Sequence, residues 1–132
     1  QDLPGAEIIT WMDDAGQAHA VRSEQINETL HTLCGPDITA KTIRTWNGTL
    51  AAFGVAQSGD TLTIKAMTEA AAEVLHNTPT VARNSYVHPA VIALADTDRD
   101  AVTEMLQNLS TAQGPAGLRQ GEADLIAFLR SV

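Results

Sequence analysis

The stretch TAKTIRTWNGTLAAFGVA, residues 39–56, predicts the helix around which the rest of the chain folds. Its large apolar side chains recur at spacings of three, four and three residues, which places them in one stripe on a helix. Thr39 can cap the N-terminus, so we expect the helix to run from Ala40 to about Ala56. The stripe that we expect to be buried consists of Ile43, Trp46, Leu50 and Phe53.

The opposite face of this helix combines two cations with a glycine. At about 100° per residue, Lys41, Arg44 and Gly48 fall on one side. A glycine inside a helix lowers its stability by about 1 kcal/mol relative to alanine. We therefore expect another backbone, or a ligand, to come close to Gly48.

Patterns on both sides of this segment predict a mainly α fold with a short β-hairpin near the N-terminus. Short alternating runs flank the turn residues Asp13-Asp14-Ala15-Gly16, and Thr78-Pro79 is a strong helix start. The expected elements are a tail over 1–5, strands over 7–12 and 17–21, a helix that Ser23 caps and Gly35-Pro36 stops, with Ile26, Leu30 and Leu33 inward, a helix from Asp60 or Thr61 to Leu75, helices over 79–88, 90–95 and 98–109, a loop over 110–120 and a last helix over 122–129.

Length and composition limit the class of protein. The 132 residues suit one compact domain, and 44% hydrophobic with 18% charged residues excludes intrinsic disorder. No apolar run has the length of a membrane span, and no charged and apolar leader opens the chain, so we expect neither a membrane segment nor a signal peptide. Cys34 is the only cysteine and cannot form an internal disulfide, which favours a reducing cytoplasm.

The net charge of −8 is unevenly distributed. Residues 1–40 have a balance of −6 and residues 89–132 a balance of −3, whereas residues 41–88 have +1. An acidic chain repels polyanions. Any surface that binds a phosphate is therefore expected from the middle third.

The sequence lacks the motifs of several common metal, nucleotide and serine-nucleophile sites. The four histidines lack metal-ligand spacing and no acidic cluster resembles a calcium loop, so we expect no metal and no cofactor. The patterns GxGxxG, GxxxxGK[ST] and GxSxG do not occur. A dyad of Cys34 with a histidine stays open, but a lone cysteine is more often structural.

Three segments remain as candidates for chemistry: KTIRTW (41–46), NTP (77–79) and RNSYVHP (83–89), which contains Tyr86, the only tyrosine. Together they resemble the C-terminal catalytic region of type IB DNA topoisomerases, in the bacterial branch that is similar to the poxvirus enzyme. The opening QDLPG, the helix from Ser23 and the closing ADLIAFLR also resemble that branch. The resemblance thus covers essentially the whole chain.

The resemblance implies the helical C-terminal catalytic lobe of the type IB topoisomerase and tyrosine recombinase fold. Residues 1–132 would be the C-terminal part of the catalytic domain of a longer enzyme. That enzyme would relax supercoiled duplex DNA without ATP or metal, as a monomer in the bacterial nucleoid.

The resemblance also implies a role for each matching residue. Tyr86 would attack a backbone phosphorus and form a 3′-phosphotyrosyl ester. Arg44 would be one of the two arginines on the nonbridging phosphate oxygens, and Asn77, nine residues before Tyr86, would occupy the position of a histidine in viral and eukaryotic enzymes. Contacts to DNA would come from Lys41, Arg83 and His88.

The chemistry of these side chains agrees with those roles. A free phenol is protonated at neutral pH, so a tyrosine nucleophile needs proton removal and stabilisation of the charge that develops. A guanidinium offers permanently charged bidentate donors to the equatorial oxygens of the phosphorane, and an amide adds another donor. Because the phosphotyrosyl ester conserves the energy of the phosphodiester, rejoining needs no ATP.

Departures from the family pattern indicate a partial active site. The family has a second phosphate-binding arginine and a general-acid lysine, and nothing upstream of Lys41 matches them; Arg22 has a different setting. Thr42-Ile43 replace the usual Asp-Phe, and the interval from Arg44 to Tyr86 is shorter than in viral enzymes. We expect this chain alone to be inactive.

Two alternatives stay open. A tyrosine recombinase catalytic domain uses the same chemistry, but its helix usually reads H-x-x-R where this chain has Lys41-x-x-Arg44. A noncatalytic helical module would bury Tyr86 far from Arg44. The topoisomerase hypothesis instead predicts both side chains on one concave surface, with Asn77 nearby.

Overall fold

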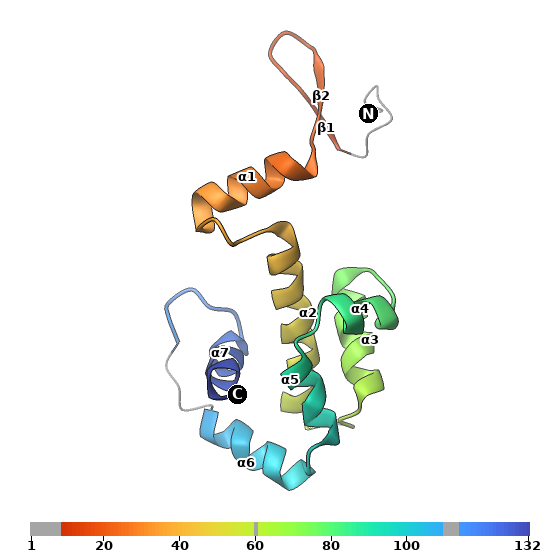
Figure 1. Cartoon of the computed structure of the whole chain (residues 1–132), viewed down its shortest axis with the longest axis vertical. Coiled ribbons are helices and arrows are strands. Elements are labelled where there is room, and N and C mark those ends of the chain that lie inside the picture. Colours follow the sequence, from red (N-terminus) through yellow and green to blue (C-terminus); the bar gives the residue numbers. More distant parts are fainter. Residues whose placement is uncertain (1–8, 60, 110–113) are drawn as a thin grey trace. The chain divides into compact units, whose positions relative to one another are not determined.

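The structure, a computed structural model, describes residues 9–59, 61–109 and 114–132. It is mainly helical with one short antiparallel hairpin, which confirms the predicted fold class (Figure 1). The chain divides into two compact units, residues 1–43 and 44–132. The elements are β1 (Thr10–Met12), β2 (Ala18–Ala20), α1 (Ser23–Cys34), α2 (Ala40–Gln57), α3 (Ile64–Leu75), α4 (Pro79–Ser85), α5 (Pro89–Ile92), the short 3₁₀ helix η1 (Ala93–Asp96), α6 (Arg99–Leu109) and α7 (Glu122–Ser131).

The smaller unit contains the predicted hairpin, which is confirmed. Trp11 pairs with His19 across the two strands, and their rings stack with centroids 4.8 Å apart. Asp13 organises the turn, because its Oδ1 accepts hydrogen bonds from the backbone N–H groups of Ala15 and Gln17. Its Oδ2 lies 2.8 Å from Nε2 of His19. The His19 contact is the largest cause that lowers the pKa of Asp13.

Helix α1 ends at Cys34, before Gly35 as predicted, but its start, its cap and its burial differ from the prediction. Arg22, rather than Ser23, is the N-cap, and its backbone N–H donates to Oε1 of Gln25 at 2.9 Å. No residue of α1 is buried, and Leu33 is 76% exposed. The inward apolar face predicted for this helix is therefore wrong, since a hairpin and one helix bury too little apolar surface to form a core.

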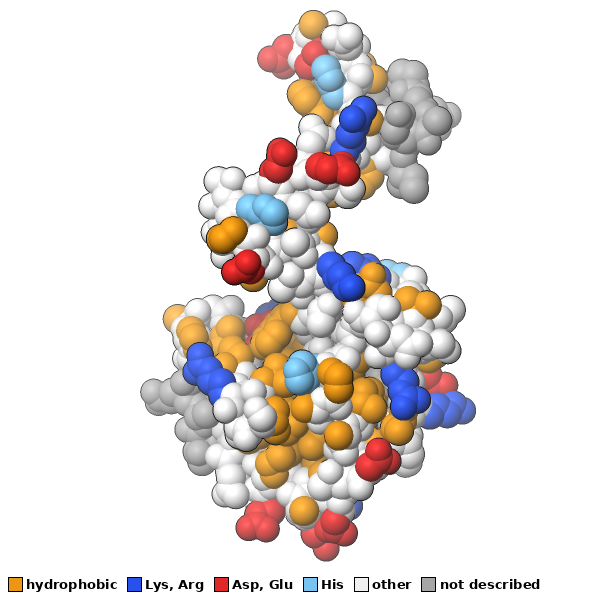
Figure 2. Space-filling model, in the orientation of Figure 1, with side chains coloured by type: hydrophobic (Ala, Val, Ile, Leu, Met, Phe, Trp, Pro, Cys, Tyr) orange, Lys and Arg blue, Asp and Glu red, His pale blue; other side chains and the backbone are white. Residues whose placement is uncertain are grey.

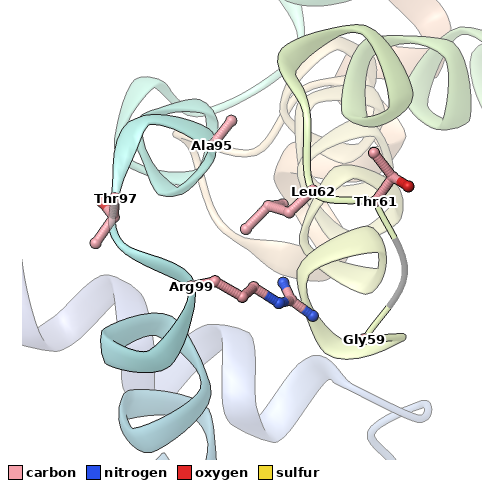
Figure 3. Close-up of a pocket in the computed structure, with 6 residues that line it drawn as sticks. All are labelled: Gly59, Thr61, Leu62, Ala95, Thr97 and Arg99. Atoms are coloured by element: carbon pink, nitrogen blue, oxygen red, sulfur yellow. The ribbon is translucent and has the colours of Figure 1, made fainter.

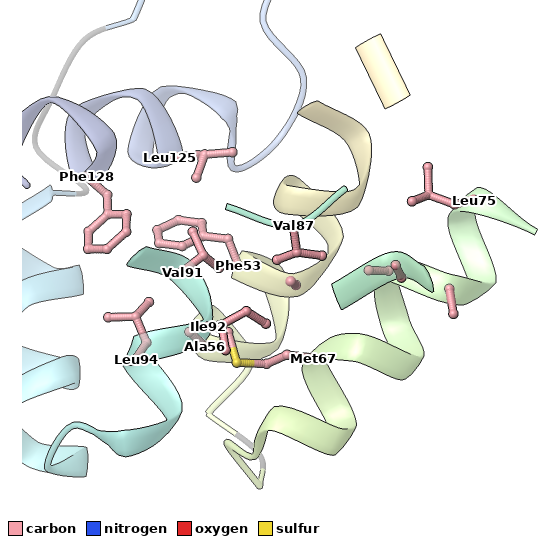
Figure 4. Packing of buried hydrophobic residues seen from close by; sticks show 14 of the residues in the cluster. Phe53, Ala56, Met67, Leu75, Val87, Val91, Ile92, Leu94, Leu125 and Phe128 are labelled. Atoms are coloured by element: carbon pink, nitrogen blue, oxygen red, sulfur yellow. The ribbon is translucent and has the colours of Figure 1, made fainter. Parts of the chain in front are cut away.

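The larger unit packs α3 to α7 around the C-terminal part of α2 (Figure 1). The rings of Phe53 in α2 and Phe128 in α7 stack with centroids 5.5 Å apart (Figure 4). Burial of each large apolar side chain contributes about 1.5–3 kcal/mol to stability. The buried cluster consists of Ala52, Phe53, Ala56, Met67, Ala71, Ala72, Leu75, Ala82, Val87, Val91, Ile92, Leu94, Val102, Leu125 and Phe128.

The stripe predicted on α2 is buried toward its C-terminal end. Phe53 is fully buried, and Trp46 and Leu50 pack partly buried against the core. Ile43 is 41% exposed, so the prediction was wrong at this position. Ile43 precedes the larger unit, where the core lies.

Helix α3 begins later than predicted. Thr63 is its N-cap, and the Thr63 hydroxyl accepts a hydrogen bond from the N–H of Ala66 at 3.1 Å. This cap fixes the start at Ile64 rather than at Thr61. The predicted start at Asp60 lies outside the described residues.

The start predicted for α4 is confirmed, and its predicted end is wrong. The Thr78 hydroxyl accepts from the N–H of Val81, and Pro79 is the first helical residue. The helix ends at Ser85 because Tyr86 leaves the helical conformation, with φ −138° and ψ 0°. Pro89 begins a separate helix, in keeping with the steric conflict between a proline and a helical residue before it.

The last two predicted helices are confirmed as α6 and α7. In α6, Val102 is buried and Met105, Leu106 and Leu109 pack against the core. Parts of three predictions lie outside the described residues: the tail over 1–5, the start of the first strand at 7 and 8, and the loop over 110–113.

Candidate functional site

Arg44 and Tyr86 meet although 42 positions separate them in the chain. Arg44 lies in α2 and Tyr86 directly follows α4. The guanidinium carbon of Arg44 lies 5.0 Å from the centroid of the Tyr86 ring. Nη2 of Arg44 also donates to the carbonyl oxygen of Leu75 at 3.0 Å. Two contacts thus hold the exposed guanidinium where the ends of α3 and α4 meet α2.

Tyr86 is half-buried, and part of its side chain packs against the core. Its backbone N–H donates to the carbonyl of Ala82 in the last turn of α4. The following residue, Val87, is buried, which holds the segment to the core on one side. The noncatalytic alternative predicted a tyrosine far from Arg44, and the observed 5.0 Å separation contradicts that geometry.

Gly48 and Thr49 of α2 contact the backbone at Tyr86. A Cβ on Gly48 would lie 2.8 Å from the Tyr86 carbonyl oxygen, so only glycine allows this approach. The Thr49 hydroxyl donates to the same oxygen at 3.4 Å. The close backbone expected at Gly48 is therefore present. Thr49 was not among the predicted site residues, although its position beside a helix-interior glycine was a signal in the sequence.

Asn77 lies in the turn between α3 and α4, two residues after the carbonyl that accepts from Arg44. Its backbone N–H donates to the carbonyl of Ala72 at 3.1 Å. Oδ1 and Nδ2 of its side chain are both buried and have no hydrogen-bond partner. A buried amide without partners is destabilising, by about 1–3 kcal/mol, and is rare in folded proteins. Asn77 therefore has unused donor and acceptor capacity two residues after the carbonyl that accepts from Arg44.

The three residues predicted to contact DNA have different settings. Lys41 is exposed near the start of α2, and Arg83 is exposed in the last turn of α4. Within the described ranges, no carboxylate forms an ion pair with either cation. His88 is the N-cap of α5, and its ring Nδ1 accepts from the N–H of Ala90 at 3.2 Å. His88 therefore has an established structural role.

A buried carboxylate supports α2 beside the site. Glu122, 6% exposed, accepts a hydrogen bond from Nε1 of Trp46 at 2.7 Å. Nη2 of Arg119 lies 2.7 Å from the same Oε1, and the Arg119 backbone N–H donates to Oε2. The hydrogen bonds from Arg119, followed by the bond from Trp46, lower the pKa of Glu122 to about 2. The contact between Trp46 and Glu122 was not predicted, because it joins positions 76 residues apart.

A cavity beside the start of α6 shares no residue with the Arg44–Tyr86 site. It has a volume of about 800 Å³ and is lined by Gly59, Thr61, Leu62, Ala95, Thr97 and Arg99 (Figure 3). The guanidinium of Arg99 is the charged group of this lining, and its Nη1 is buried without a hydrogen-bond partner. Among the described lining residues, the side chains beside this cation that carry an acidic, basic or nucleophilic group are the two threonines, with their hydroxyls.

In the described residues, no group of three or more His, Cys, Asp or Glu side chains is arranged to hold a metal ion. Cys34 is a free, exposed thiol. No described helix combines the length and the apolar character needed to cross a bilayer.

Comparison of the sequence with models of known protein families and with characterised proteins gives no match. The geometry of the site and the sequence motifs are therefore the basis for a functional hypothesis.

Proposed function

We propose that this chain is the helical catalytic portion of a type IB DNA topoisomerase, with Tyr86 as nucleophile. In this function the enzyme relaxes supercoiled duplex DNA by transient cleavage of one strand and religation. Arg44 and Asn77 bind the scissile phosphate. The second arginine and the general-acid lysine come from sequence N-terminal to this chain.

The observation on which the proposal rests is the contact between Arg44 and the Tyr86 ring. A guanidinium has five N–H donors in one plane. One of them bonds to the Leu75 carbonyl, and the guanidinium carbon lies over the tyrosine ring, 5.0 Å from its centroid. The remaining donors on its edge are free to bind two phosphate oxygens beside the phenol.

Asn77 supports the same assignment. Its amide is buried and unpartnered in the turn that follows the Leu75 carbonyl. An amide kept in this state at a stability cost is expected at a functional site. In the proposed enzyme, Nδ2 of Asn77 donates to a nonbridging oxygen as negative charge develops on it.

The reaction is an exchange of two phosphate esters. The phenolic oxygen of Tyr86 forms a bond to phosphorus and releases its proton to solvent water, while the bond from phosphorus to the 5′-oxygen breaks. The leaving oxygen takes up a proton from the general acid. Reversal of the same steps rejoins the strand, so the reaction consumes no ATP.

The charge distribution limits how this chain meets DNA. On the face drawn in Figure 2, hydrophobic side chains gather over the larger unit, and its Lys and Arg side chains lie toward the edges of that area. Lys41, Arg44 and Arg83 are the exposed cations of the three motif segments. In the proposed enzyme, most of the basic surface that holds the duplex belongs to other parts of the protein.

The test joins this chain to its natural upstream sequence and supplies a nicked, radiolabelled suicide duplex. The proposal expects a covalent protein–DNA adduct that Tyr86→Phe abolishes. Phenylalanine keeps the ring that contacts Arg44 and removes only the nucleophilic oxygen, so the thermal melting of the variant serves as the control for folding. An unchanged adduct yield in Tyr86→Phe would exclude Tyr86 as the nucleophile.

Assays of the same protein with plasmid DNA distinguish a topoisomerase from a tyrosine recombinase. Relaxation of a supercoiled plasmid without exchange between two sites supports a topoisomerase. Strand exchange that requires two paired sites would assign the same residues to a recombinase. No adduct and no relaxation by a folded protein would favour the noncatalytic module.

A further inference from the structure

Thr49 contacts the backbone on both sides of Val87, within the segment that links α4 to α5. Its hydroxyl donates to the carbonyl of Tyr86 at 3.4 Å and accepts from the N–H of His88 at 3.1 Å. The residue is 2% exposed, so water does not compete freely for these bonds. One side chain of α2 therefore satisfies two backbone groups that flank a single residue.

These two backbone groups need an outside partner. Helix α4 ends at Ser85 and α5 begins at Pro89, so residues 86–88 lie between helices. Tyr86 has φ −138° and ψ 0°, outside the helical conformation. A buried carbonyl or N–H without a partner is strongly disfavoured. Thr49 supplies both a donor and an acceptor in one group.

Gly48 sets how closely this segment approaches α2. A Cβ there would lie 2.8 Å from the Tyr86 carbonyl oxygen and 2.9 Å from Cδ1 of Leu75. Leu75 is also the residue whose carbonyl accepts from Arg44. The same face of α2 therefore contacts the backbone of Tyr86 and holds Arg44 near the Tyr86 ring.

We infer that Thr49 is a positioning residue for the Tyr86 nucleophile, and that Gly48 allows the contact. This inference rests on the proposed function. Arg44 and Thr49 are separated by five residues of one helix, a rise of about 7.5 Å. Because a helix is stiff, fixing the Tyr86 backbone to Thr49 fixes the nucleophile relative to the cation that binds the phosphate. Small displacements of reacting groups slow catalysis strongly.

The first test measures single-turnover adduct formation in the protein that includes its upstream sequence. Thr49→Val keeps the shape and removes the hydroxyl, and we expect adduct formation to slow roughly tenfold to hundredfold. Thr49→Ser, which keeps the hydroxyl, is expected to restore most of the rate. Thr68→Val is the matched control, because Thr68 is also buried, at 5%, and bonds only within α3, to the Lys65 carbonyl.

A lower melting temperature in both valine variants, with a slower reaction in Thr49→Val alone, supports positioning. Equal rates in wild type and Thr49→Val would overturn the inference and leave the proposed function intact. If Thr49→Val does not fold, Thr49→Cys is compared with Thr49→Ser, since the thiol is the weaker hydrogen-bonding group. Equal rates in that pair would likewise overturn it.

The second test needs no catalysis. Because Tyr86 is the only tyrosine, fluorotyrosine labelling of this chain gives a single fluorine NMR signal. We expect Thr49→Val to shift or broaden that signal and Thr68→Val to leave it unchanged. An unchanged signal in Thr49→Val would show that Thr49 does not hold the ring, whether or not the protein cleaves DNA.

Discussion

The guanidinium carbon of Arg44 lies 5.0 Å from the centroid of the Tyr86 ring, and this pairing joins α2 to the residue that ends α4. The ring offers its face to the cation, an attraction of about 0.5–1 kcal/mol at an exposed site. The contact therefore contributes little to stability. Its value in the proposed enzyme is the fixed separation between the nucleophile and a phosphate-binding group.

Arg44→Ala is expected to slow adduct formation on the order of a hundredfold or more in the protein with its upstream sequence. The reason is the loss of charged donors to the phosphate oxygens in the transition state. Arg130→Ala is the charge-matched control, since Arg130 is exposed in the last turn of α7. A rate in Arg44→Ala equal to that of Arg130→Ala would contradict the assignment.

Asn77→Leu separates stability from function. It removes a buried amide that has no hydrogen-bond partner, so we expect the free energy of unfolding to be unchanged or to rise by about 1 kcal/mol. The same variant is expected to slow adduct formation, because leucine cannot donate to the phosphate. Urea unfolding of this chain and a single-turnover assay measure the two effects. A large loss of stability would mean that the amide has a structural partner after all.

Gly48 and Gly54, both in α2, allow a controlled comparison of the same substitution with and without a close neighbour. Gly48→Ala is expected to lower the free energy of unfolding by about 1–3 kcal/mol, since its Cβ would overlap the Tyr86 carbonyl oxygen and Leu75. A Cβ on Gly54 meets nothing within 4 Å, so Gly54→Ala is expected to raise stability by about 0.5–1 kcal/mol. Denaturant midpoints measure both. Similar shifts for the two variants would refute the close approach at Gly48.

The hydrogen bond from Trp46 in α2 to the Glu122 carboxylate in α7 is expected to weaken in acid. The pKa of Glu122 falls from 4.5 to about 2 on folding, so the folded state favours the charged carboxylate. Its contribution to stability is complete above pH 4.5 and is lost as the pH falls toward 2. Glu122→Gln is expected to lower stability at neutral pH and to flatten this acid dependence.

The fluorescence of Trp46 reports this transition directly. The chain has two tryptophans, so Trp11→Phe leaves Trp46 as the single tryptophan, and excitation at the red edge of the absorption band avoids Tyr86. Denaturant unfolding at several pH values, followed by the Trp46 fluorescence, measures how much of the free energy of unfolding is lost in acid. A profile that is the same with glutamate and glutamine at position 122 would exclude Glu122 as its source.

Binding of this chain to duplex DNA is expected to be weak and to depend little on salt. Each phosphate that a cation neutralises changes the logarithmic salt slope by about −0.9, so the three motif cations give roughly −3. Lys41→Ala is expected to reduce the slope by about 1. Lys65→Ala is the control, since its ammonium already lies 3.9 Å from Glu69. A salt titration with nanomolar affinity and a slope near −8, as expected of about nine neutralised phosphates, would contradict the prediction.

Sequence reasoning was most successful where the signal is local. The Thr78-Pro79 start of α4 and the spacing of α6 follow from caps and helical period, which act within a few residues. It failed for the buried face of α1, because burial depends on what packs against a helix. It also placed the end of α4 at residue 88, since the sequence pattern did not reveal the break at Tyr86.

Most helical segments and the candidate residues could be predicted from the sequence alone, because periodicity, caps and motifs are properties of neighbouring positions. Which of those residues contact one another follows from the packing of the helices. The contacts from Arg44 to Leu75, from Thr49 to Tyr86 and from Trp46 to Glu122 join positions 31, 37 and 76 residues apart. Such contacts depend on how side-chain volumes fill one shared core, which no short pattern specifies.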